Sequence, residues 1–223
     1  MEEEKAQKFV TILIIVTVIL IVIVGIIAAA MVYKNNKNEN TAKEALEDFD
    51  KATLSGIDQD PGKIDNGTGN YVPEKINSDD KNKKKNRRVK IETYDVVGKI
   101  RIPKTNVEYP ILYPLEARSL EIGTAMLQTT SGLNKPGNTT ILGHNYRNGK
   151  FFSNNHKLKK GDKIYIKNIE GEEAEYEVYK GETLLPNDAS YMTRDTNGAT
   201  EISLSTCNDD SSQRYVLYAK RVK

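Results

Sequence analysis

The chain has 223 residues, of which 33 are basic and 31 acidic, so its formal net charge is only +2. This balance gives no global positive field, and we therefore expect no nucleic-acid partner. The single cysteine excludes an intramolecular disulfide, so an apolar core must hold the fold together.

An uncharged run of 25 residues extends from Phe9 to Tyr33 between Lys8 and Lys34. As a helix it would be about 37 Å long, which exceeds the roughly 30 Å hydrocarbon layer of a bilayer. The run predicts a transmembrane anchor over residues 9–33. A cleaved signal peptide stays open because Ala28–Ala30 supply small residues, although its apolar region is usually only about 7–15 residues long.

The charges beside this run do not decide its orientation. Lys5 and Lys8 precede it, and Lys34 and Lys37 follow it. The positive-inside rule therefore favours neither topology.

Residues 34–90 are predicted to form a linker with one short helix. Apolar residues recur at helical spacing in Thr41–Leu54, which predicts an amphipathic helix that packs on the domain or lies against the membrane. Residues 55–90 contain mostly Gly, Asn, Asp, Lys and Pro, a composition that buries little surface. The basic run Lys81–Arg88 is either a solvated tether or a segment that docks on anionic phosphates.

From residue 91 to 223 the pattern changes to short Val-, Ile-, Tyr- and Thr-rich stretches between turn residues. This pattern predicts a single all-β domain, a barrel or a sandwich, with a short helical turn at Phe151–Leu158. The expected strands are Val96–Ile102, Val107–Leu112, Thr139–Gly143, Lys163–Lys167, Ala174–Glu182, Glu201–Thr206 and Arg214–Arg221.

The last two strands hold the only thiol. Alternation along residues 201–207 places Cys207 on the face opposite the apolar Ile202 and Leu204. A polar turn follows, and a hairpin would place Arg214 opposite Cys207 with Cβ atoms about 5 Å apart. A guanidinium there favours the thiolate and can hold a negative oxygen. The alternative is a small buried cysteine beside a solvated arginine.

Two histidines are present. His144 directly follows the apolar strand at residues 139–143, and strand ends at the rim of a barrel are places where sites are built. A purely structural role for His144 stays open. His156 lies in the polar stretch 153–160, and we predict that it is a surface residue.

Taken together, these residues resemble the sortase family. The matching segments are Thr140–Asn145 (TILGHN), Leu204–Cys207 (LSTC) and Arg214–Lys220 (RYVLYAK), and Val97–Pro103 is similar to the family's first strand. The resemblance covers residues 95–223.

The resemblance implies a closed eight-stranded β-barrel with one or two short helices, preceded by the transmembrane helix. It implies that Cys207 attacks a sorting-signal peptide of an exported protein and that the acyl group passes to an amine of peptidoglycan or a pilin. By position, His144 protonates the leaving amine and Arg214 stabilises the oxyanion. Thr206 and Asn145 are expected to contact the substrate.

The same resemblance favours class B or a class D-like member, because Asn145 follows the histidine whereas Leu184–Thr200 is short for the class B helical insertion. No cofactor is expected. Some relatives bind Ca²⁺, but no acidic spacing here demands it. Because the substrates are exported, we expect residues 1–8 in the cytoplasm and a single-pass membrane protein with an extracellular catalytic domain.

Two other functions compete with that of a sortase. Cysteine transpeptidases that crosslink peptidoglycan have a histidine two residues before the cysteine, and Ser205 occupies that position here. A non-catalytic adhesin or receptor domain, in which the three site residues coincide by chance, stays open.

Overall fold

The computed structural model describes residues 2–54, 63–64, 71–72, 89–127 and 132–223. The chain forms two compact units, Met1–Asn40 and Thr41–Lys223. The long helix α1 (Glu2–Leu54) includes most of the first unit and the start of the second. Most of the expected linker, including the basic run Lys81–Arg88, lies outside the described residues.

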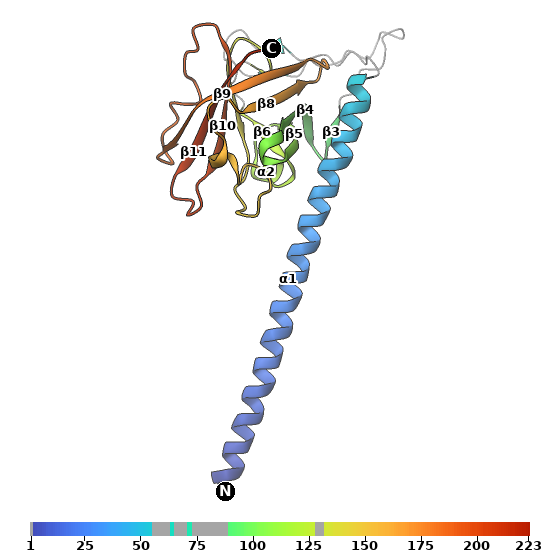
Figure 1. The fold of residues 1–223 in the computed structure, drawn as a ribbon. Helices are drawn as coiled ribbons and strands as arrows, with labels where there is room; N and C mark the ends of the chain where they lie inside the picture. Colours follow the sequence, from blue (N-terminus) through green and yellow to red (C-terminus); the bar gives the residue numbers. More distant parts are fainter. Residues whose placement is uncertain (1, 55–62, 65–70, 73–88, 128–131) are drawn as a thin grey trace. The chain divides into compact units, whose positions relative to one another are not determined.

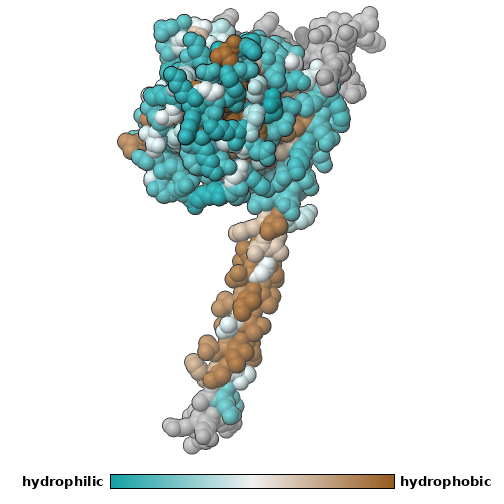
Figure 2. Space-filling view, viewed as in Figure 1, coloured by the Kyte–Doolittle hydropathy of each residue, from teal (hydrophilic) through white to brown (hydrophobic). Residues whose placement is uncertain are grey.

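In the first unit, α1 is apolar on all sides. Its large apolar side chains from Phe9 to Tyr33 are all exposed, and Figure 2 shows this stretch as an almost continuous hydrophobic surface. The helix is long and apolar enough to cross a membrane. The N-terminal helix is therefore a candidate membrane anchor, as the sequence predicts.

The second unit is a closed β-barrel (Figure 1). Its strands follow one another around the barrel in the order β4-β5-β6-β7-β10-β11-β9-β8, and pairing of β8 with β4 closes it. The bounds are β4 (Tyr94–Ile102), β5 (Val107–Tyr113), β6 (Thr124–Met126), β7 (Gly137–Leu142), β8 (Lys163–Asn168), β9 (Glu173–Leu184), β10 (Thr200–Cys207) and β11 (Arg214–Arg221). The expected eight-stranded barrel is confirmed.

Smaller elements complete the described part of this unit. β3 (Lys90–Ile91) pairs with the N-terminal end of β4, and β1 (Lys63–Ile64) pairs with β2 (Tyr71–Val72). The helices are α2 (Ala117–Ile122) and the short 3-10 turns η1 (Pro103–Thr105) and η2 (Asn155–Lys157). Seven barrel strands and the turn at η2 are as predicted from the sequence, whereas β6 and α2 were not predicted.

The barrel interior is built by alternation. In β8, for example, every second side chain is buried, because successive side chains of a strand point to opposite faces. Tyr176 is completely buried, and its hydroxyl donates a hydrogen bond of 3.0 Å to Oδ1 of Asn134. The other completely buried large side chains of this core include Ile100, Ile102, Ile111, Ile141, Phe152, Ile164, Ile166 and Ile202.

The end of α1 packs on the barrel. Ala42, Ala45 and Phe49 are buried in one apolar cluster with residues of β3 to β6 and α2. Nζ of Lys99 donates to both carboxylate oxygens of Asp50 at 2.9 and 2.8 Å. Of the two alternatives for Thr41–Leu54, the structure therefore shows packing on the domain. The compact unit begins near residue 41, well before the expected start at residue 91.

The connection between β9 and β10 covers the outer face of three strands. Tyr191 is buried in a cluster with Val216 and Tyr218. The side-chain amide of Asn138 on β7 donates to the carbonyl of Tyr191 at 2.9 Å, and Arg194 forms a 2.6 Å ion pair with Glu201. We call residues 185–199 the covering segment.

Candidate active site

The thiol and the guanidinium meet where β10 ends and β11 begins. The antiparallel register pairs Cys207 with Arg214, and Nη1 of Arg214 donates to Sγ of Cys207 at 2.8 Å. The hairpin register predicted from the polar turn is therefore confirmed. The guanidinium is therefore placed to stabilise negative charge that develops beside the sulfur.

His144 comes to the same place from the other side of β10. β7 runs parallel to β10 with Leu142 opposite Ser205, and the backbone N–H of Gly143 donates to the carbonyl of Ser205 at 3.1 Å. β7 ends at Leu142, and continuing this register by two residues would bring His144 level with Cys207. His144, Cys207 and Arg214 thus lie at the same end of three neighbouring strands, β7, β10 and β11, and we call them the row.

Within this row, Cys207 lies on the outer face of the barrel. Ile141 and Leu204 point into the core, so their neighbours in sequence point outward. Ser205 is buried under the covering segment, where its hydroxyl donates to the Tyr191 hydroxyl at 3.1 Å. Cys207 lies two residues beyond this cover and is only partly buried. The thiol can therefore be reached from solvent.

Burial shapes the titration of the histidine. Partial burial lowers the pKa of His144 below its ordinary value of 6.5, and the carboxylate of Glu121 on α2 opposes this shift. The neutral imidazole is therefore favoured over a wider pH range than in a free peptide.

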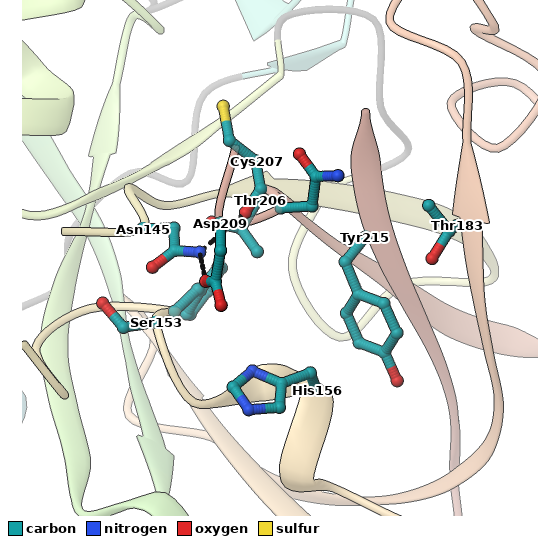
Figure 3. Close-up of a pocket in the computed structure, with 10 residues that line it drawn as sticks. Asn145, Ser153, His156, Thr183, Thr206, Cys207, Asp209 and Tyr215 are labelled. Carbon is teal, nitrogen blue, oxygen red and sulfur yellow. Dashed lines mark hydrogen bonds between the residues drawn. The ribbon is translucent and has the colours of Figure 1, made fainter. Parts of the chain in front are cut away.

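Asn145 forms hydrogen bonds with Cys207 and with the loop that follows it (Figure 3). Its Nδ2 donates to the carbonyl of Cys207 at 3.0 Å and to Oδ1 of Asp209 at 2.9 Å. Its Oδ1 accepts the backbone N–H of Arg147 at 3.0 Å. A substrate contact was predicted at Asn145. In the structure its side-chain amide forms hydrogen bonds with other residues of the protein.

A pocket of about 250 Å³ opens on the other side of Cys207. Its described lining includes Thr206, Tyr215 and His156, but neither His144 nor Arg214. In Figure 3 the sulfur of Cys207 points away from the rings of Tyr215 and His156. Cys207 itself and Asn145 also line the pocket, but the sulfur lies away from the part of the pocket that Tyr215 and His156 line.

Predictions were made from the sequence for Thr206 and His156, and both residues line this pocket. The hydroxyl of Thr206 is buried and has no hydrogen-bond partner within the described part of the chain, so it can still bind a ligand. His156 is exposed, as expected, although it also lines the pocket. Only the tertiary structure brings η2 to this end of β10. Across residues 2–54, 63–64, 71–72, 89–127 and 132–223, no three His, Cys, Asp or Glu side chains gather as a metal site.

A partly exposed cysteine paired with an arginine, at the same end of the barrel strands as a histidine, is an arrangement that nucleophilic cysteine chemistry can use. The family model described as Sortase domain matches residues 100–222. The chain therefore belongs to the sortase family, whose members are cysteine transpeptidases.

Named relatives agree with this assignment. Sortase A of Bacillus anthracis is 35% identical over 130 residues, which are 57% of this chain and 60% of that protein. Sortase D of Bacillus subtilis (strain 168) is 30% identical over 151 residues, 66% of this chain and 73% of that protein. The crystal structure of sortase C-1 from Actinomyces oris superposes with a TM-score of 0.54 at 29% identity and covers 58% of this chain and 75% of that one. These relatives belong to classes A, D and C.

Proposed function

We propose that this chain is a membrane-anchored sortase that cleaves a C-terminal sorting signal of exported proteins and transfers the acyl group to a cell-wall amine. The observation that carries the proposal is the 2.8 Å contact between Arg214 and the only thiol of the chain, at the same end of the barrel strands as His144. Family membership supports the same reaction class.

The reaction balances with these three side chains. His144 takes the proton of the Cys207 thiol as the sulfur attacks the carbonyl carbon of the scissile bond, and Arg214 holds the developing oxyanion. The C–N bond breaks as the leaving nitrogen takes a proton from His144, which leaves a thioester and a neutral imidazole. An acceptor amine then attacks the thioester, gives one proton to His144 and releases the thiolate.

The remaining assignments follow from this mechanism. Thr206, with its unpartnered hydroxyl, is a candidate substrate contact beside the nucleophile. Asn145 would act by fixing the Cys207 backbone, since its amide is already bonded there. The mechanism requires no metal or cofactor. Exported substrates require the catalytic unit outside the cell and residues 1–8 in the cytoplasm.

The reaction can be tested with the full chain in detergent micelles. We expect cleavage of one peptide from a panel of LPXTG-like and NPQTN-like sequences, and a new amide product when an amine acceptor is added. Mass spectrometry should show a hydroxylamine-sensitive acyl adduct on the protein. The rival reading, a non-catalytic surface domain, predicts no adduct with any peptide and slow reaction of Cys207 with a thiol-reactive probe.

The lowered pKa of His144 predicts a pH dependence of stability. Between the lowered folded pKa and 6.5, the unfolded chain binds the proton that the folded chain resists, so stability falls as the pH drops through this window. His144→Gln removes this loss. Urea unfolding at pH 7.5 and 5.0 should therefore show a smaller pH effect in His144→Gln than in the wild type.

His156→Gln is the matched control, because His156 is exposed. It should keep the wild-type difference between the two pH values. An equal pH effect in His144→Gln and the wild type would contradict the burial of the imidazole.

A further inference from the structure

A group of packed aromatic rings adjoins His144. The imidazole lies 4.8 Å from the ring of Tyr146, centroid to centroid. Tyr146 packs edge-on against Phe151 at 5.4 Å, and Phe151 stacks on Tyr109 of β5 at 4.3 Å. We call Tyr109, Tyr146 and Phe151 the aromatic shelf. Phe151 is buried, whereas Tyr146 is 43% exposed at the outer edge of the shelf.

The loop after β7 holds Tyr146 in this exposed position. Asn145 and Phe151 form a β-bridge, and the N–H of Phe152 donates to the carbonyl of His144 at 3.0 Å. The N–H of Tyr146 itself donates to Oγ of Ser153 at 3.0 Å. The ring is therefore carried by a braced backbone and is not at the tip of an untethered loop.

The chemistry at His144 identifies what this surface meets. The imidazole that protonates the leaving nitrogen must later take a proton from the entering nitrogen, so both nitrogens occupy the same side of the thioester. Arg214 lies on the opposite side of Cys207 in the row. The entering amine must therefore approach on the His144 side, where the exposed ring of Tyr146 lies.

The geometry points to Tyr146 as a binding residue for the acceptor, a primary amine on an aliphatic chain whose methylene groups lie on the aromatic shelf. This inference rests on the proposed function. The apolar ring also removes water from around the amine, which favours the neutral form that attacks the thioester. When the amide forms, the nitrogen loses one proton to His144 and Cys207 leaves as the thiolate.

The partition of one acyl-enzyme between amine and water tests this inference. With the full chain in micelles, a cleaved sorting peptide and either triglycine or Nα-acetyl-lysine amide as acceptor, we expect Tyr146→Ala to lower the aminolysis-to-hydrolysis ratio about tenfold, the effect of losing contact with about two methylene groups. The ratio is independent of the rate of acylation. The two acceptors distinguish a backbone amine from a side-chain amine.

The pH profile gives a second readout that a structural role would not move. Loss of the ring should shift the rise of aminolysis to higher pH, because a better hydrated amine keeps its proton longer. Tyr146→Phe keeps the ring and should retain both the ratio and the profile. Tyr165→Ala removes a tyrosine on β8 whose ring stacks with Arg101 at 4.1 Å, and it should leave both unchanged.

The outcomes separate the two proposals. If no acyl-enzyme forms in the wild type, the proposed function fails. If an acyl-enzyme forms and Tyr146→Ala partitions like the wild type with both acceptors, the function stands and the acceptor role of Tyr146 is wrong. A Tyr146→Phe variant as poor as Tyr146→Ala would also overturn it, because the ring would then not be the binding feature.

Discussion

We expect Cys207→Ala to abolish peptide cleavage while the barrel stays folded. Cys207 is the only thiol of the chain, so no other side chain can form the thioester. We expect the rate to fall on the order of 10⁴-fold or more, as it does when other acyl-transfer enzymes lose their nucleophile. The acyl adduct of the wild type should be absent from the variant in the mass spectrum.

The fold should tolerate this change because Cys207 lies at a strand end and is only partly buried. The variant loses one hydrogen bond to Arg214, which costs about 1 kcal/mol or less at such a site. Circular dichroism and thermal unfolding should therefore match the wild type closely. Continued turnover by Cys207→Ala would show that another residue performs the chemistry.

Arg214→Lys should lower kcat/KM by on the order of 10²–10³, the scale of losing one oxyanion donor. Arg214 already contacts Sγ through Nη1, which leaves the other donors of its planar fork for the substrate oxygen. A lysine keeps the charge, but its flexible ammonium cannot hold the sulfur and the oxyanion in a fixed geometry together. Arg214→Ala should be at least as severe. Steady-state cleavage of one peptide by the three proteins measures the difference.

Arg221→Lys is a matched control on the same strand, because Arg221 forms an ion pair of 2.8 Å with Glu172 at the other end of β11. It should keep wild-type kcat/KM. Near-wild-type activity in Arg214→Lys would mean that charge alone suffices at position 214, and activity in Arg214→Ala would remove the residue from the site.

The sequence was sufficient to predict features that depend on a single strand or a single turn. The alternation in residues 201–207 placed Cys207 opposite the core-facing side chains, and the polar turn placed Arg214 across from it. Seven strands were visible because each is at least six residues long. β6 has three residues and α2 has six, which is too short for a period to show.

The sequence itself thus determined the apolar run, the thiol and the hairpin that pairs it with Arg214, and the resemblance of residues 95–223 to the sortase family determined the predicted class of chemistry. The tertiary structure decided what depends on contacts between distant segments. The parallel pairing of β7 with β10 places the residues that follow β7, among them His144, at the Cys207 end of β10. The covering segment buries Ser205 but not the thiol, and the barrel surface buries the apolar side of residues 41–54. Periodicity shows that a face is apolar, but the partner that covers it is set by the packing of the whole chain.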